Sequence, residues 1–76
     1  MNLYDYMYKD VQLVDSNGNN WFGYVDEFED QDENDNGETA ITLNIKRSDT
    51  GLVGPVCFRK SEISDIIVLT SELVAS

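Results

Sequence analysis

The sequence has no histidine and a single cysteine, Cys57. One thiol cannot form a disulfide within the chain, and without histidine it cannot complete a tetrahedral zinc site. No run of 18 apolar residues is present, so we expect no membrane-spanning helix. The first residues also lack the basic start and apolar core of a signal peptide. We therefore expect a cytoplasmic protein with no cofactor, no bound metal and no membrane association.

Basic residues are scarce, with 5 against 15 acidic residues and a net charge of -10. This charge repels phosphate backbones and anionic membrane surfaces. At 76 residues the chain predicts a single domain, 1–76, that buries only roughly 60% of the surface of its unfolded form. Because disulfides and zinc are excluded, oligomerisation is the remaining source of extra stability.

A β-hairpin is the clearest local pattern in the sequence. Val11–Val14 and Trp21–Phe28 are rich in strand-forming residues, and Asp-Ser-Asn-Gly-Asn-Asn separates them. Asn and Gly tolerate the positive φ angles of tight turns, so this segment predicts the turn. Gly23 lies inside the second run, where a glycine indicates a bend or a close backbone approach. A long, bent second strand is typical of a small barrel.

The rest of the chain predicts a mainly β fold. The other predicted elements are a short helix over Asn2–Lys9, strands over Thr39–Lys46, Leu52–Arg59 and Asp65–Thr70, and a 3₁₀ turn over Ser61–Ser64. Asn2 and Ser61 are the predicted caps of the helix and of the turn. Pro55 cannot donate to a strand ladder, so we expect it at a sheet edge or a bulge.

This order of elements resembles the Sm/LSM family over nearly the whole chain. The matching positions of its first motif are Val11, Leu13, Gly18, Trp21, Gly23, Val25, Phe28 and Glu29, and those of its second are Val56-Cys57-Phe58-Arg59-Lys60 and Ile63-Ser64-Asp65-Ile66. The chain is similar in particular to small Sm-like proteins of Gram-positive bacteria and mobile elements. The resemblance implies an SH3-like, five-stranded barrel with a short N-terminal helix. It also implies a homo-oligomer in which Leu52–Arg59 of one subunit pairs with Asp65–Thr70 of the next.

The resemblance also implies a candidate RNA site at Arg59 and Lys60. RNA-binding members carry an Asn and an apolar or aromatic residue after the first motif and a Gly after the Arg. In this chain the first positions fall in the acidic loop around Asp30–Glu33 and Lys60 replaces the Gly, so only Arg59 carries over. Further candidates are the cations Lys46 and Arg47 and the stacking faces of Trp21, Phe22 and Tyr24. The charge of -10 opposes RNA binding at such a small basic patch.

Glu29–Glu38 contains six acidic residues and no apolar residue, so we expect a solvated loop. The alternative is a recognition element that offers spaced negative charges to a basic protein. Its residues would be Asp30, Asp32, Glu33 and Asp35. The stretch from Asp32 to Gly37 also matches half of a calcium-binding EF-hand loop. Because Leu43 replaces the glutamate at the twelfth position, we interpret the stretch as a turn without metal.

No pattern of catalytic residues is present. Cys57 has no base beside it, and its place between Val56 and Phe58 predicts a buried or half-buried structural thiol. The sequence therefore predicts a non-enzymatic Sm-like barrel that acts as an oligomeric interaction or assembly module. The alternatives are an RNA-binding protein that uses Arg59 and Lys60, and an acidic nucleic-acid-mimicking inhibitor from a phage or mobile element.

Overall fold

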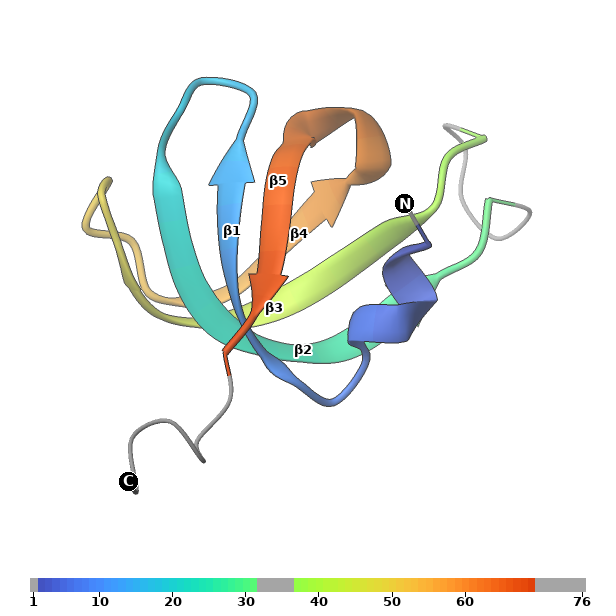
Figure 1. Cartoon of the computed structure of the whole chain (residues 1–76), viewed down its shortest axis with the longest axis horizontal. Coiled ribbons are helices and arrows are strands. Elements are labelled where there is room, and N and C mark those ends of the chain that lie inside the picture. The colour runs from blue at the N-terminus through green and yellow to red at the C-terminus, as the bar shows by residue number, and fades with distance from the viewer. Residues whose placement is uncertain (1, 32–36, 70–76) are drawn as a thin grey trace.

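The protein forms one strongly curved antiparallel sheet in the computed structural model, which describes residues 2–31 and 37–69 (Figure 1). The elements in chain order are η1 (Leu3–Tyr6), β1 (Asp10–Asp15), β2 (Asn20–Glu29), β3 (Ala40–Ser48), β4 (Gly54–Arg59), η2 (Lys60–Glu62) and β5 (Ile63–Val68). The five strands lie in the order β4-β3-β2-β1-β5, so the predicted mainly β fold is confirmed. The sheet does not close, because β4 and β5 are its two ends. No helix among the described residues is long and apolar enough to cross a membrane.

β2 is the longest of the described strands and curves along its length (Figure 1), and Gly23 lies within it. The register between β2 and β3 shifts at Phe22/Gly23 and again between Val25 and Glu27. A Cβ atom at position 23 would lie 2.5 Å from the main-chain oxygen of Asn44, a distance that no real Cβ contact allows. The predicted close backbone approach at Gly23 is therefore confirmed.

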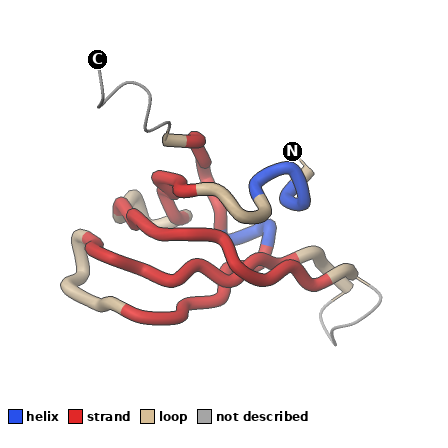
Figure 2. Tube along the Cα trace, turned by 90° about the horizontal axis from the view of Figure 1, so that it is seen from below, coloured by secondary structure: helices blue, strands red, loops and turns tan. Residues whose placement is uncertain are grey.

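The strands of the curved sheet lie around a common interior (Figure 2). Their buried apolar side chains pack into one core cluster. The buried apolar residues are Leu3, Val11, Leu13, Trp21, Val25, Ala40, Ile41, Leu43, Ile45, Phe58, Ile63 and Ile66. The predicted alternation on β3 is confirmed, since Ile41, Leu43 and Ile45 are buried. Trp21 and Phe58 meet edge to face, with ring centroids 5.2 Å apart, and join β2 to β4 across the core.

The N-terminal helix is shorter than predicted and has 3₁₀ geometry. Asn2 Oδ1 accepts the N–H of Tyr4, so the predicted cap is confirmed. The helix ends at Tyr6 because Met7 has a non-helical ψ of 136° and Tyr8 has a positive φ of 61°. Tyr8 N–H then donates to the Val25 oxygen at 2.8 Å. The chain thus bonds to β2 instead of completing the predicted helix to Lys9.

The turn before β5 also differs from the prediction. It spans Lys60–Glu62, and its N-cap residue is Arg59 rather than the predicted Ser61. Ser61 instead donates its N–H and its hydroxyl to the Glu38 carboxylate, at 3.0 and 3.1 Å. β5 begins at Ile63, two residues earlier than predicted.

Pro55 lies on β4, an end strand of the sheet, as predicted. Its register partner is Asn44 on β3. β4 begins at Gly54 rather than Leu52, because Gly54 takes a positive φ of 94° that ends the preceding loop.

Candidate interaction site

The two edge strands of the open sheet are the candidate interaction site. In a strand, successive residues direct their main-chain N–H and C=O groups to opposite sides. Lys60 N–H donates to Thr39 O at 2.9 Å, so residue 60 faces β3. The alternate residues Pro55, Cys57 and Arg59 therefore direct their main-chain groups away from the sheet.

The same argument applies to β5. Leu69 N–H donates to Asp10 O at 2.8 Å, so residue 69 faces β1. Ile66 and Val68 therefore direct their main-chain groups outward. Rows of outward-facing groups of this kind are templates for pairing with another strand.

Several of the outward-facing residues of β4 and β5 have no main-chain N–H available to a neighbouring strand. Pro55 has no N–H, and the Arg59 N–H donates to Glu62 Oε1 at 2.9 Å. The Ile66 N–H donates to Asp65 Oδ1 at 2.9 Å. Cys57 on β4 and Val68 on β5 keep outward N–H groups with no hydrogen bond to another described residue.

Exposed apolar side chains lie on and beside both edges. Ile67 and Leu69 at β5 are 49% and 43% exposed, and Leu52 and Val53, which lead into β4, are 57% and 67% exposed. Cys57 is exposed as well, so the predicted buried or half-buried thiol is wrong. Strand alternation explains the difference, because the neighbouring Phe58 takes the core-facing position.

The predicted basic patch does not form, because its cations lie at opposite ends of the sheet. Arg59 pairs with Ala40 at the start of β3, whereas Lys46 and Arg47 lie near its end. Arg59 Nε lies 3.2 Å from Glu62 Oε1. Lys60 is exposed beside Arg59 in the chain.

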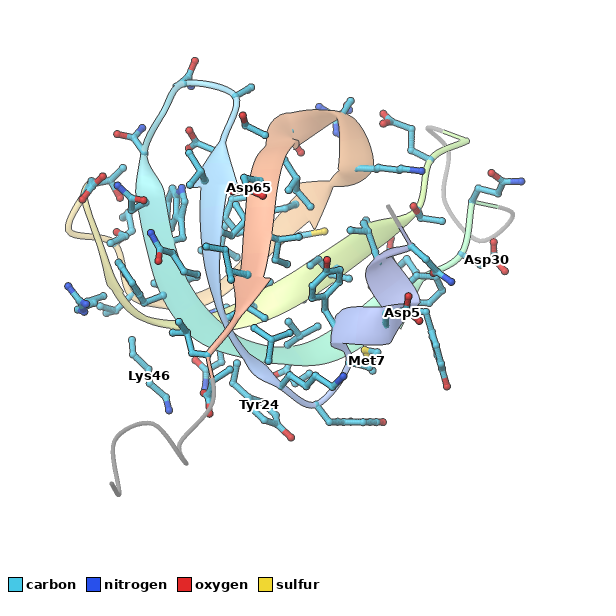
Figure 3. All side chains as sticks on the ribbon, viewed as in Figure 1. Asp5, Met7, Tyr24, Asp30, Lys46 and Asp65 are labelled. Atoms are coloured by element: carbon cyan, nitrogen blue, oxygen red, sulfur yellow. The ribbon has the colours of Figure 1, made fainter. Side chains whose placement is uncertain are left out.

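Each cation of the other pair already has a contact. Lys46 Nζ lies 3.4 Å from Asp10 Oδ1, and the Arg47 guanidinium lies 3.8 Å from the Phe22 ring centroid. Figure 3 shows Lys46 and Tyr24 on the outer side of the curved sheet. Tyr24 is half-buried.

Trp21 offers no face for stacking. It is only 6% exposed, and its indole Nε1 donates to Asp15 Oδ2 at 2.8 Å. The remaining candidate stacking side chain, Phe22, is half-buried and lies under Arg47.

The acidic loop is described only at its two ends. Asp30 is exposed just after β2 (Figure 3), and Glu38 is bonded to Ser61 as noted above. This contact attaches the end of the loop to η2. The other predicted partner-binding residues, Asp32, Glu33 and Asp35, and most of the EF-hand-like stretch lie outside the described residues.

Hydrogen bonding lowers the pKa of three carboxyl groups. The main-chain N–H of Arg59 lowers the pKa of Glu62, and that of Asn20 lowers the pKa of Asp49. For Asp15, partial burial raises the pKa, but hydrogen bonds from Trp21 and from two main-chain N–H groups outweigh it and lower it overall.

Sequence reasoning missed Glu62 and Asp65 as residues of the sheet edges. A glutamate three residues after a cap is a capping signal, and this spacing could have indicated the contact of Glu62 with Arg59. No local pattern indicates the contact of Asp65 with the next N–H.

In the described part of the chain, no three His, Cys, Asp or Glu side chains are grouped so that they could hold a metal ion.

Comparison with protein families, with curated proteins and with solved structures found no match to this chain.

Proposed function

We propose that this chain is a non-enzymatic Sm-like barrel that acts as an oligomeric assembly module, with copies joined edge to edge through β4 and β5. The observation that carries the proposal is the open sheet, whose two end strands have outward-facing main-chain groups beside exposed apolar side chains. The resemblance to Sm/LSM proteins, in which the same two strands join subunits, supports the same pairing.

Burial of apolar side chains favours pairing at these edges. Fully burying an aliphatic side chain contributes about 1.5–3 kcal/mol. Ile67 and Leu69 are about half exposed and would gain part of that amount each on pairing. For a domain of 76 residues with a small core, such a gain is a large fraction of its stability.

Pro55 does not prevent the pairing. In an antiparallel junction with Cys57 opposite Ile66 of the neighbour, Cys57 N–H donates to the Ile66 oxygen. The neighbour's Val68 N–H donates to the Pro55 oxygen, which a proline still offers. The junction brings the exposed Cys57 side chain beside the core-facing Ile66 of the neighbour and covers it.

The test is the mass in solution from micromolar to millimolar concentration, measured by light scattering. The native chain is expected to give a multiple of its monomer mass. Cys57→Pro removes an outward N–H of β4 without breaking a bond to β3, and it is expected to shift the chain to monomers. Cys57→Ser keeps the N–H and is the matched control. A monomer mass for the native chain at every concentration would overturn the proposal.

RNA binding at Arg59 and Lys60 stays a prediction that no contact favours, since Arg59 is bonded to Glu62. It would be supported if the native chain shifts the electrophoretic mobility of a U-rich or A-rich oligonucleotide at low salt and the Arg59→Ala variant does not.

The acidic inhibitor also stays a prediction. Neutralising Asp30, Asp32, Glu33 and Asp35 together would abolish capture of a basic protein partner while the circular dichroism of the fold is unchanged. Capture that persists in this variant would exclude the loop as the binding element.

A further inference from the structure

Carboxylates occupy a main-chain donor on each of the two free edges. Glu62 Oε1 accepts the outward N–H of Arg59 at the end of β4, and Asp65 Oδ1 accepts the outward N–H of Ile66 on β5. We call these two side chains the edge caps. Glu62 is also bonded to Arg59 Nε at 3.2 Å, so the side chain is held at two points.

The edge caps compete with the neighbouring strand for the same donors. The junction described above requires the Ile66 N–H to donate to the Cys57 oxygen of the next copy, yet Asp65 already accepts this N–H. A hydrogen bond to a charged carboxylate is stronger than one to a main-chain oxygen. Pairing must therefore first break the stronger bond.

We propose that Glu62 and Asp65 regulate assembly by capping the two sheet edges, so that subunits join only when the caps are released. This inference rests on the proposed function, because it concerns the same β4–β5 junction. It gives a physical role to two acidic residues that make no contribution to the core. It also explains how a small domain with exposed apolar side chains at its edges avoids uncontrolled strand pairing.

The test compares two double variants with equal net charge. Glu62→Ala with Asp65→Ala removes both acceptor oxygens, whereas Glu62→Gln with Asp65→Asn removes both charges and keeps an oxygen acceptor at each position. Sedimentation equilibrium gives the dissociation constant of self-association for each. We expect the alanine pair to lower that constant at least about tenfold, because two donors are left without partners. The Gln/Asn pair should give a dissociation constant between those of the native chain and the alanine pair, because a neutral amide oxygen accepts a weaker hydrogen bond than a carboxylate.

Each outcome decides between the two proposals. If the native chain assembles and the alanine pair has the same dissociation constant, the edge caps are overturned and the proposed function stands. Equal strengthening by both double variants shows an effect of charge alone and also overturns the caps. Absence of association in all three proteins overturns both proposals. Adding Cys57→Pro to the alanine pair must restore monomers, since otherwise the association is aggregation rather than edge pairing.

A second measurement does not depend on the folding of a variant. Amide hydrogen exchange of the native monomer, at a concentration below assembly, should show protection at Arg59 and Ile66. It should show none at Cys57 and Val68, whose outward N–H groups lack such caps. Exchange at Arg59 and Ile66 as fast as at Cys57 would overturn the proposal.

Discussion

Trp21 and Asp15 join the two strands of the first hairpin through a 2.8 Å hydrogen bond from the indole Nε1 to the carboxylate Oδ2. The other carboxylate oxygen accepts the N–H groups of Asn17 and Asn19, both at 2.9 Å. One side chain thus shapes the turn and satisfies the polar atom of a buried aromatic ring.

Asp15→Ala is therefore expected to destabilise the fold more than a surface substitution does. The change leaves the indole N–H of Trp21 without a partner, and the free energy of unfolding should fall by about 1–3 kcal/mol. Urea unfolding followed by Trp21 fluorescence measures the loss. Asp26→Ala, at an exposed position of β2, is the control. Equal unfolding midpoints for the two variants would contradict the role of Asp15.

Gly23→Ala is expected to be among the most damaging single changes in the chain. Its Cβ would meet the main-chain oxygen of Asn44 at 2.5 Å, and backbone cannot move aside as a flexible side chain can. We expect a loss of at least about 3 kcal/mol, the upper end for overpacking.

Gly51→Ala is the matched control for Gly23→Ala. Gly51 has a φ of 84°, and no atom lies near the place of its missing Cβ. An alanine there therefore costs only the strain of a left-handed backbone conformation. The cost there should be about 1–2 kcal/mol. Thermal unfolding of both variants checks the order, and a smaller effect at position 23 would contradict the close approach.

The Cys57 thiol is expected to react with a thiol reagent in the folded protein, because it is exposed on β4. Labelling of dilute native chain should proceed without denaturant at the rate of the unfolded chain to within about tenfold. Raising the protein concentration into the range of assembly should slow it, since the junction covers Cys57. Labelling that requires denaturant would contradict the exposed position.

Acid is expected to destabilise the fold through the three carboxyl groups whose pKa is lowered by hydrogen bonds: Asp15, Asp49 and Glu62. Below the ordinary pKa values of Asp and Glu, about 3.9 and 4.3, the unfolded chain binds more protons than the folded chain. The stability they contribute is thus complete above this range and is lost as the pH falls through their lowered values.

The measurement is the urea midpoint of the native chain between about pH 7 and pH 3. The double variant Asp49→Asn with Glu62→Gln is measured in the same way. The difference in urea midpoint between the native chain and this variant should become smaller as the pH falls. Subtracting the curves removes most of the general repulsion within a chain of net charge -10. A constant difference across the range would contradict the assignment.

Local sequence was sufficient for the strands and for the special position of Gly23. The alternation of Ile41, Leu43 and Ile45 predicts a half-buried strand because successive side chains point to opposite faces. Gly23 predicts a close approach because any other residue carries a Cβ. The strand inference holds because its cause lies within a few residues of the chain. The glycine inference holds because the missing Cβ is a property of the residue itself, whereas the identity of the approaching backbone, Asn44, follows only from the pairing of β2 with β3.

The spacing of Glu62 after Arg59 indicates their contact, but no local pattern shows that the acidic groups of the candidate site lie at the edges of the sheet. Whether a carboxylate caps an outward N–H depends on which strands end the sheet, and that depends on pairings between residues far apart in the chain. The exposure of Cys57 has the same origin, since its register opposite Thr42 places its side chain on the outer face.

The amino-acid sequence by itself determined a mainly β chain, its hairpin, a position at Gly23 that excludes a side chain, and its excess of negative charge, because propensity, periodicity and charge are local properties. The tertiary structure alone decided that β4 and β5 are edges, that Arg59 and Lys46 lie apart, and that Glu62 and Asp65 occupy edge donors. Sheet order sets these relationships, and it follows from the packing of all strands around one core.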